Sequence, residues 1–151
     1  MPEPSTSATV SATLARVHVF AGLDDSTLQL LSARAAVQSF PPGQWIAQQG
    51  ELSSSFFCLL AGKVAVLRGT VILAELGPGE CFGEMSMLEC KPRSAGVRAA
   101  EPCQVASLKS TDLLAIYRER PDQYAIIILN LARDLARRLH RLDEAFAAIT
   151  A

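Results

Sequence analysis

The sequence lacks an excess of basic residues. Its 151 residues include 14 Lys and Arg against 15 Asp and Glu, which gives a net charge of −1. Domains that bind nucleic acids usually carry a clustered positive charge. We therefore expect no direct nucleic-acid binding by this chain.

Long apolar runs are also missing. No stretch approaches the roughly 18 apolar residues that a membrane-spanning helix needs. The N-terminal stretch MPEPSTSATV has Glu3 and two prolines where a signal peptide needs positive charge and then an apolar core. We expect a cytoplasmic protein without a membrane span.

The sequence has no closely spaced cysteines. Cys58, Cys81, Cys90 and Cys103 are separated by 23, 9 and 13 positions. This spacing fits neither a CxxC metal site nor a disulfide-rich secreted scaffold. We interpret the cysteines as buried, reduced thiols and expect no metal or cofactor; a redox sensor built on Cys81 and Cys90 is the alternative.

Motifs of common enzyme classes are absent as well. There is no nucleophile elbow and no Walker loop, and His18 and His140 lie far apart in the sequence. The stretch GPGECFG only loosely matches a dinucleotide fingerprint, because the long helix of that motif does not follow it. We therefore predict that the chain is not an enzyme.

What the chain does contain is a series of short apolar stretches between residues 37 and 108. Turn signals such as PPG, AG, RG and GPG separate them at intervals of about 7 to 12 residues, which is typical of an all-β sandwich or barrel. Only the stretch from about 80 to 92 breaks this rhythm and predicts one or two helical turns. The length fits one domain, made of an N-terminal tail and helices (1–36), a β region (37–108) and C-terminal helices (109–151).

Helices are predicted on both sides of the β region. The first two cover about 7–19 and 25–35, and Ser110, Thr111 and Asp112 are candidate cap residues for a third. A long helix follows from 122 to about 149. It has a heptad-like seam at Ile128, Leu131, Leu135, Arg138, Leu142, Ala145 and Ile149. Two interpretations stay open, and both can hold on different parts of the helix: the stripe packs on its own domain, or it forms a homodimer with a second copy.

The stretch from 79 to 96, GECFGEMSMLECKPRSAG, has the residues of an anion site. Gly83 lets the backbone approach a ligand, and the N–H groups of a first helical turn attract anions. Arg93 can grip a phosphate with two parallel hydrogen bonds, and Ser94 adds a hydroxyl. Glu84 suits a neutral sugar hydroxyl. The alternative is that Glu84 and Arg93 form a surface salt bridge.

The segment GPGECFGEMSMLECKPRSAGVRA resembles the phosphate-binding cassette of the cyclic nucleotide-binding domain family. FAGLDDSTLQLLS, FPPGQWIAQQGE and FFCLLAGKVAVL upstream, followed by VILAELGPGE, are similar to the helix and β-roll of that family. The long helix after PDQYA is similar to that of catabolite-activator-type proteins. The resemblance covers residues 18 to 142. It implies a jelly-roll-like β-roll, a double-stranded β-helix, with N-terminal helices and a long C-terminal helix. We expect no helix-turn-helix domain, because the chain stops at Ala151.

The resemblance also implies roles for single residues. Glu84 would take the ribose 2′-hydroxyl and Arg93 the phosphate oxygens. Ser94 favours cyclic AMP over cyclic GMP. At the helix positions that would read the purine the chain has Arg138 and Leu139 instead of a hydroxyl pair, so Arg138, His140 or Arg141 would stack on the base. The full set of implied ligand-binding residues is Gly83, Glu84, Met85, Arg93, Ser94, Ala95 and Arg138. The family often has Thr or Ser where this chain has Gly96.

The resemblance finally implies a switch. Phosphate capture would pull the cassette inward, and Met87 with Leu88 would pass this movement to the hinge before the long helix. The expected function is a cyclic nucleotide sensor that acts on an unknown downstream protein. The alternatives are a degenerate roll that serves as an interaction domain or senses another effector, and the sensor part of a larger regulator, such as a transcription factor, channel or enzyme.

Overall fold

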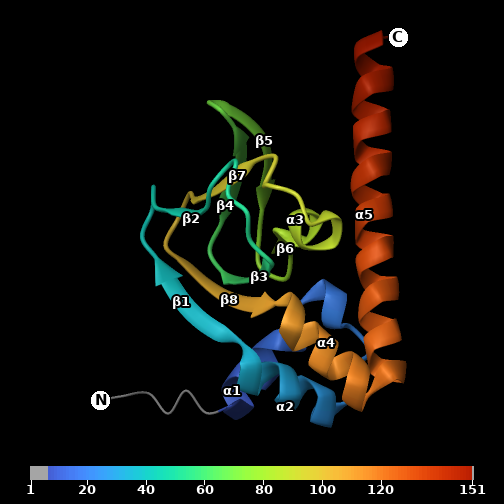
Figure 1. Ribbon diagram of the computed structural model, residues 1–151. Coiled ribbons are helices and arrows are strands. Elements are labelled where there is room, and N and C mark those ends of the chain that lie inside the picture. Colours follow the sequence, from blue (N-terminus) through green and yellow to red (C-terminus); the bar gives the residue numbers. More distant parts are fainter. Residues whose placement is uncertain (1–6, 151) are drawn as a thin grey trace.

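Two antiparallel sheets of four strands form the β-roll. The computed structural model describes residues 7–150. One sheet has the strand order β1-β8-β3-β6 and the other the order β2-β7-β4-β5 (Figure 1). The strands are β1 (Ala36–Phe40), β2 (Trp45–Ala47), β3 (Ser55–Ala61), β4 (Val64–Arg68), β5 (Val71–Leu76), β6 (Cys81–Phe82), β7 (Gly96–Ala99) and β8 (Cys103–Lys109). The β-roll predicted from the sequence is confirmed.

The first sheet separates two hydrophobic cores at strands β3, β6 and β8, whereas its strand β1 is largely exposed. Side chains of a strand alternate between faces, and along β3 Cys58 faces the helices while Leu59 faces the interior of the roll. Leu59 packs there with Phe82 and Val105. The helix-side core includes Phe20, Leu31, Ile116 and Ile127. Burial on both faces holds β3 and β6 in place, and the cassette begins at the end of β6.

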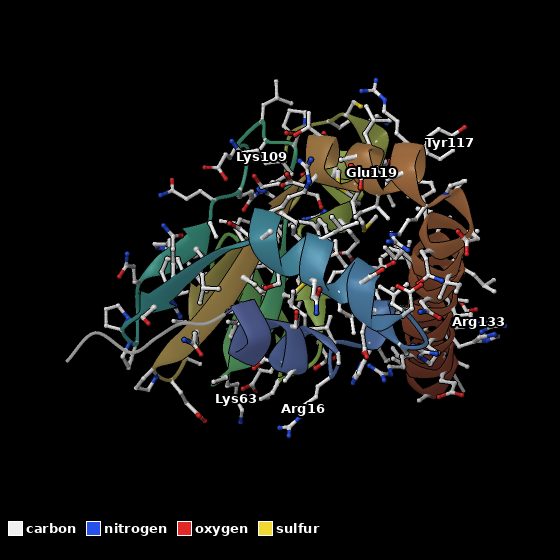
Figure 2. The ribbon with its side chains drawn as sticks, turned by 90° about the horizontal axis from the view of Figure 1, so that it is seen from below. Arg16, Lys63, Lys109, Tyr117, Glu119 and Arg133 are labelled. Carbon is white, nitrogen blue, oxygen red and sulfur yellow. The ribbon has the colours of Figure 1, made fainter. Side chains whose placement is uncertain are left out.

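Helices α1 (Ser7–Leu14), α2 (Asp25–Arg34) and α4 (Ser110–Glu119) lie across one end of the roll, as the view from below shows (Figure 2). The helix predicted over 7–19 is shorter than expected, because a separate 3₁₀ turn, η1 (His18–Phe20), follows it. Asp24 caps α2 by accepting from the Thr27 N–H at 2.8 Å, and these hydrogen bonds lower the pKa of Asp24. At α4 the N-cap residue is Lys109, and Asp112 in the first turn accepts from the Lys109 N–H at 2.7 Å.

The long helix α5 (Pro121–Thr150) stands along one side of the roll and continues past the cassette helix α3 (Glu84–Glu89) (Figure 1). Its first half is fixed to the N-terminal helices. The Gln123 Oε1 atom accepts from the Asp24 N–H at 2.9 Å, and the Asn130 amide donates to the Val19 and Ala21 carbonyls at 3.1 and 2.8 Å. No helix of the described chain is long and apolar enough to cross a membrane.

The seam predicted along α5 divides between the domain and the outside, since its members Leu142 and Ile149 are 68% and 82% exposed. Leu131, one of its members, is only 5% exposed and packs in the helix-side core. Leu139 and Phe146, which the predicted seam omitted, are 60% and 69% exposed. The helix therefore has two apolar stripes, one packed on its own domain and one facing outward.

Candidate functional site

The cassette closes on itself around Gly83. The backbone of Gly83 has φ = +84°, the left-handed region that favours glycine, and it caps the six-residue helix α3. A Cβ atom on Gly83 would lie 2.7 Å from the Nη1 atom of Arg93. Only glycine therefore lets the arginine approach so closely. The loop between Glu89 and Arg93 returns Arg93 to the start of α3, as the sequence predicted.

The Arg93 guanidinium is buried and bound by the protein on almost every side. Its side chain is 3% exposed. Nε donates to Glu51 Oε1 at 3.1 Å, Nη1 to Ser86 Oγ at 3.1 Å and to the Gly83 carbonyl at 3.4 Å, and Nη2 to the Ser55 carbonyl at 3.1 Å. A guanidinium has five N–H donors, so these four contacts leave little hydrogen-bonding capacity unused. The plane also lies 5.4 Å from the centre of the Phe57 ring.

The main chain around Arg93 is fixed as well. The Arg93 N–H donates to the Glu51 carbonyl at 2.9 Å, and the Arg93 carbonyl accepts from the Gly50 N–H at 2.8 Å. Glu51 therefore holds Arg93 through both its backbone and its side chain. This pairing ties the loop before β3 to the end of the cassette.

Glu84 is also buried, and its partner comes from the far helix. Glu84 is 2% exposed, and its Oε1 atom accepts a short hydrogen bond from Arg138 Nη1. Arg138 Nη2 donates to the Cys81 carbonyl at 2.6 Å and also lies 3.0 Å from Asp134 Oδ2. A buried carboxylate needs such a partner, because desolvation of an unpaired charge is costly.

The predicted surface salt bridge between Glu84 and Arg93 is therefore wrong. Both residues are buried, and each pairs with a different residue: Arg93 with Glu51 and Glu84 with Arg138. Arg138 is itself 28% exposed and is part of the site, not a freely solvated helix residue. Its predicted stacking on a purine stays a prediction.

The remaining cassette residues lie around this pair. Ser94 and Met85 are exposed and Ala95 is half-buried. Met87 packs against the helix-side core, and together with Leu88 it lines a groove of about 350 Å³. Helices α4 and α5 form the rest of that groove, with Ser110, Thr111, Leu113, Leu114, Tyr124 and Ile128. The two residues predicted to act on the hinge thus lie beside it.

Steric crowding explains why position 96 is a glycine. A Cβ atom there would lie 2.8 Å from the Cζ3 atom of Trp45 and 3.2 Å from the Ala47 carbonyl. The Trp45 ring thus occupies the space that the Thr or Ser side chain of other sequences would need. The guanidinium carbon of Arg98 lies over the same ring, 5.3 Å from its centre.

The cysteines are free thiols. Cys58 and Cys81 are directly opposite each other on β3 and β6, with their sulfur atoms 3.5 Å apart. The predicted burial holds for Cys58, Cys81 and Cys103 and is wrong for Cys90, which is exposed. The alternative of a redox sensor built on Cys81 and Cys90 stays a prediction. The hydrogen bond with Cys58 and burial raise the pKa of Cys81 well above its ordinary value. A thiol of this kind is unreactive. Among the described residues there is no cluster of His, Cys, Asp and Glu that could hold a metal ion.

Sequence reasoning did not assign a role to Glu51 or Ser86. Both contact the Arg93 guanidinium, at 3.1 Å each. The signal was present for Glu51, since it follows Gly50 at the end of the family-like block FPPGQWIAQQGE. Ser86 is buried within α3 and also donates to the Ser53 carbonyl at 3.3 Å.

The family model of the cyclic nucleotide-binding domain matches residues 37–120. The chain belongs to the cyclic nucleotide-binding domain family. The matched region contains the whole roll and the cassette, so the resemblance stated from the sequence is confirmed. The buried Glu84 and Arg93 lie inside this region and Arg138 lies outside it.

Individual relatives agree with this assignment. The cyclic AMP receptor protein of Thermus thermophilus is 36% identical over 130 residues, which are 83% of this chain and 58% of that protein. A crystal structure of the catabolite activator protein of Thermus thermophilus aligns with a TM-score of 0.74 and 34% identity, covering 87% of this chain and 62% of that one. Glutaminase 2 of Bradyrhizobium diazoefficiens is 36% identical over 130 residues, but these are only 21% of its length. This chain thus spans about three fifths of the cyclic AMP receptor protein.

Proposed function

We propose that this cyclic nucleotide-binding domain is a sensor that binds cyclic AMP in preference to cyclic GMP. The observation that supports it best is the buried pair of opposite charges at the start of α3, where Arg93 returns to the backbone of Gly83 and Glu84 follows. Arginine suits the single charge of a cyclic phosphate, and a carboxylate suits the neighbouring ribose hydroxyl. The relatives named for cyclic AMP and the serine at position 94 favour the adenine nucleotide. Binding needs no cofactor.

The described contacts suggest how binding reaches the C-terminal helices. A phosphate that takes hydrogen bonds from Arg93 competes with Glu51, and a ribose hydroxyl that donates to Glu84 competes with Arg138. Arg138 lies on α5 and also donates to the Cys81 carbonyl, so its release from Glu84 removes one of the two contacts through which this side chain ties the helix to the cassette. A ligand shifts such an equilibrium only by its differential affinity for the two arrangements. We propose that the groove beside Met87 and Leu88 repacks in the same step.

Calorimetric titration of cyclic AMP, cyclic GMP and 5′-AMP tests the binding proposal. We expect the tightest binding for cyclic AMP. Arg93→Leu should reduce the affinity by about 10- to 100-fold, since hydrogen bonds to charged groups contribute about 1.5 to 3 kcal/mol. Because Arg93 is buried, Arg93→Lys serves as a second variant that keeps the charge. Circular dichroism shows which variants remain folded.

The result that would overturn the proposal is an absence of binding heat for every nucleotide with folded wild-type protein. The second candidate function, a roll that serves only as an interaction domain or senses another effector, would then be favoured. A specific observation supports that candidate: the protein's own residues already satisfy both charged groups. The downstream partner, the role as part of a longer regulator, and the cytoplasmic location stay predictions.

A further inference from the structure

Cys58 and Cys81 form a pair of thiols across the neighbouring strands β3 and β6. Both are free and buried, and their sulfur atoms lie 3.5 Å apart. The two residues are directly opposite each other in the register of the strands. The sulfur atoms of a disulfide are about 2.05 Å apart, so a shift of about 1.5 Å separates this contact from a covalent bond.

The backbone at this pair suits a disulfide. The Leu59 N–H donates to the Glu80 carbonyl at 2.9 Å. Such bonds alternate along an antiparallel ladder, so the next pair, Cys58 and Cys81, has none between its own main chains. The Cys81 carbonyl agrees with this, because it accepts from Arg138 Nη2 on α5 at 2.6 Å. In pairs of this kind the Cα atoms are about 4.5 Å apart, which lies within the range of disulfides.

Access limits the reaction of these thiols. Cys58 is 0% and Cys81 2% exposed, and buried thiols react slowly. However, β6 has only two residues and lies at the edge of its sheet, beyond β3. Arg138 holds this edge through the Cys81 carbonyl and through Glu84. Local opening of such an edge needs less free energy than global unfolding.

We propose that Cys58 and Cys81 form a reversible disulfide, and that this bond clamps the start of the cassette onto the roll. The oxidant is a small disulfide such as glutathione disulfide. When β6 opens, the Cys81 thiolate attacks one sulfur atom of the oxidant and releases the first glutathione. The Cys58 thiolate then attacks the Cys81 sulfur and releases the second. The two cysteines lose two electrons and two protons, and the oxidant takes them up as two thiols.

The bond acts on the cassette because β6 leads directly into it. Gly83 and Glu84, at the start of α3, follow the two residues of β6 (Figure 1). With Cys81 bonded to β3, the edge strand can no longer detach. Oxidation therefore fixes the start of the cassette independently of Arg138. This inference does not depend on which ligand the cassette binds.

Oxidation of the Cys90→Ser protein tests the bond. This background removes the exposed thiol, and Cys103, which is 4% exposed, stays as a reporter of general unfolding. After incubation with glutathione disulfide, alkylation and peptide mass spectrometry should show Cys58 joined to Cys81 and Cys103 still reduced. The melting temperature should rise by about 5 to 10 °C, because the bond closes a loop between residues 23 positions apart. Dithiothreitol should reverse both changes.

Arg138→Met in the same background tests the route of access. Loss of the contacts that hold the edge should speed disulfide formation by about tenfold or more. Alkylation of Cys103 should accelerate much less. Arg137→Met is the matched control, because Arg137 lies next to Asp134 and should leave the rate unchanged. Equal acceleration at Cys103 and at the pair would show general unfolding and overturn the role of the edge strand.

Two other results would overturn the bond itself. One is oxidation of Cys103 while Cys58 and Cys81 stay reduced. The other is a folded protein that keeps glutathione on Cys81 beside a reduced Cys58, because the second thiol should displace it. Cys58→Ala supplies the reference for that species, since its reaction should stop at the mixed disulfide. Circular dichroism shows that each protein is folded.

Discussion

Replacing Arg138 by methionine is expected to destabilise the domain more than its position on a partly exposed helix suggests. The change keeps a long apolar stem but removes the partner of Glu84, which is 2% exposed. Breaking a buried ion pair on one side costs about 3 to 5 kcal/mol. Since the Arg138 side chain is 28% exposed, water can reach the gap, and we expect about 2 to 3 kcal/mol. For a domain of this size this lowers the melting temperature by about 5 to 10 °C.

A double-mutant cycle with Glu84→Gln isolates the ion pair from the other contacts of Arg138. The double variant should be more stable than the sum of the two single changes implies, by about 1 to 2 kcal/mol, because the uncompensated carboxylate is gone. The measurements are thermal and urea denaturation.

Arg137→Met is the matched control for this cycle. Arg137 is the neighbouring residue, 55% exposed, and its Nη2 atom lies 3.5 Å from Asp134. Its loss should change the stability by about 0.5 kcal/mol or less. If Arg138→Met is no more destabilising than Arg137→Met, Glu84 does not depend on Arg138 and the reasoning fails.

Three further results are expected. Gly83→Ala should lower the free energy of unfolding by about 1 to 3 kcal/mol more than Gly43→Ala in denaturation experiments. Both glycines have positive φ, but only Gly83 has a neighbour within 4 Å of the added Cβ. Equal losses of stability would contradict the close contact with Arg93. Gly96→Ser should shift the fluorescence spectrum of Trp45, the single tryptophan of the chain, because the added Cβ atom would lie 2.8 Å from its ring. An unchanged spectrum would count against this packing. The free energy of unfolding should fall as the pH rises above about 9, because the raised pKa of Cys81 lets the native state keep a proton that the unfolded chain loses. Cys81→Ala should make the free energy of unfolding depend less steeply on pH in this range. An unchanged pH dependence would be evidence against a buried thiol.

The β-roll could be predicted because its signals are local. Each strand is a short apolar stretch with a turn residue on either side, and α3 (Glu84–Glu89) appears where that rhythm breaks. The return of Arg93 to Gly83 could be predicted for the same reason, since the two residues are only ten positions apart.

The partners of the two charged groups could not be predicted, because they come from distant segments. Glu51 is 42 positions from Arg93, and Arg138 is 54 positions from Glu84. Only the packing of the roll and of α5 (Pro121–Thr150) brings them together. The sequence suggested a pair of Glu84 and Arg93 only because they are oppositely charged and nine positions apart in the same segment.

The sequence could not show which part of the α5 seam packs on the domain. Leu131 and Ala132 are adjacent, and each extends an apolar repeat that passes through Ile128 and Leu135. A periodic pattern cannot say which of two neighbouring stripes faces the domain. The contacts of Asn130 with the backbone of Val19 and Ala21 decide it, because they fix the rotation of the helix.

Glu51 and Arg138, the protein's own partners of Arg93 and Glu84, differ in what would follow if a ligand displaced them. The main chain of Arg93 is hydrogen-bonded to the carbonyl of Glu51 and to the N–H of Gly50, so losing the side-chain contact of Glu51 leaves the loop attached. Arg138 contacts the cassette through its side chain, at Glu84 and at the Cys81 carbonyl, whereas the hydrogen bonds of α5 to the N-terminal segments lie in its first half. The phosphate contact with Arg93 therefore contributes affinity, whereas displacement of Arg138 from Glu84 weakens the attachment of the second half of α5. Under the proposed function, the phosphate anchors the ligand and the ribose hydroxyl sends the signal.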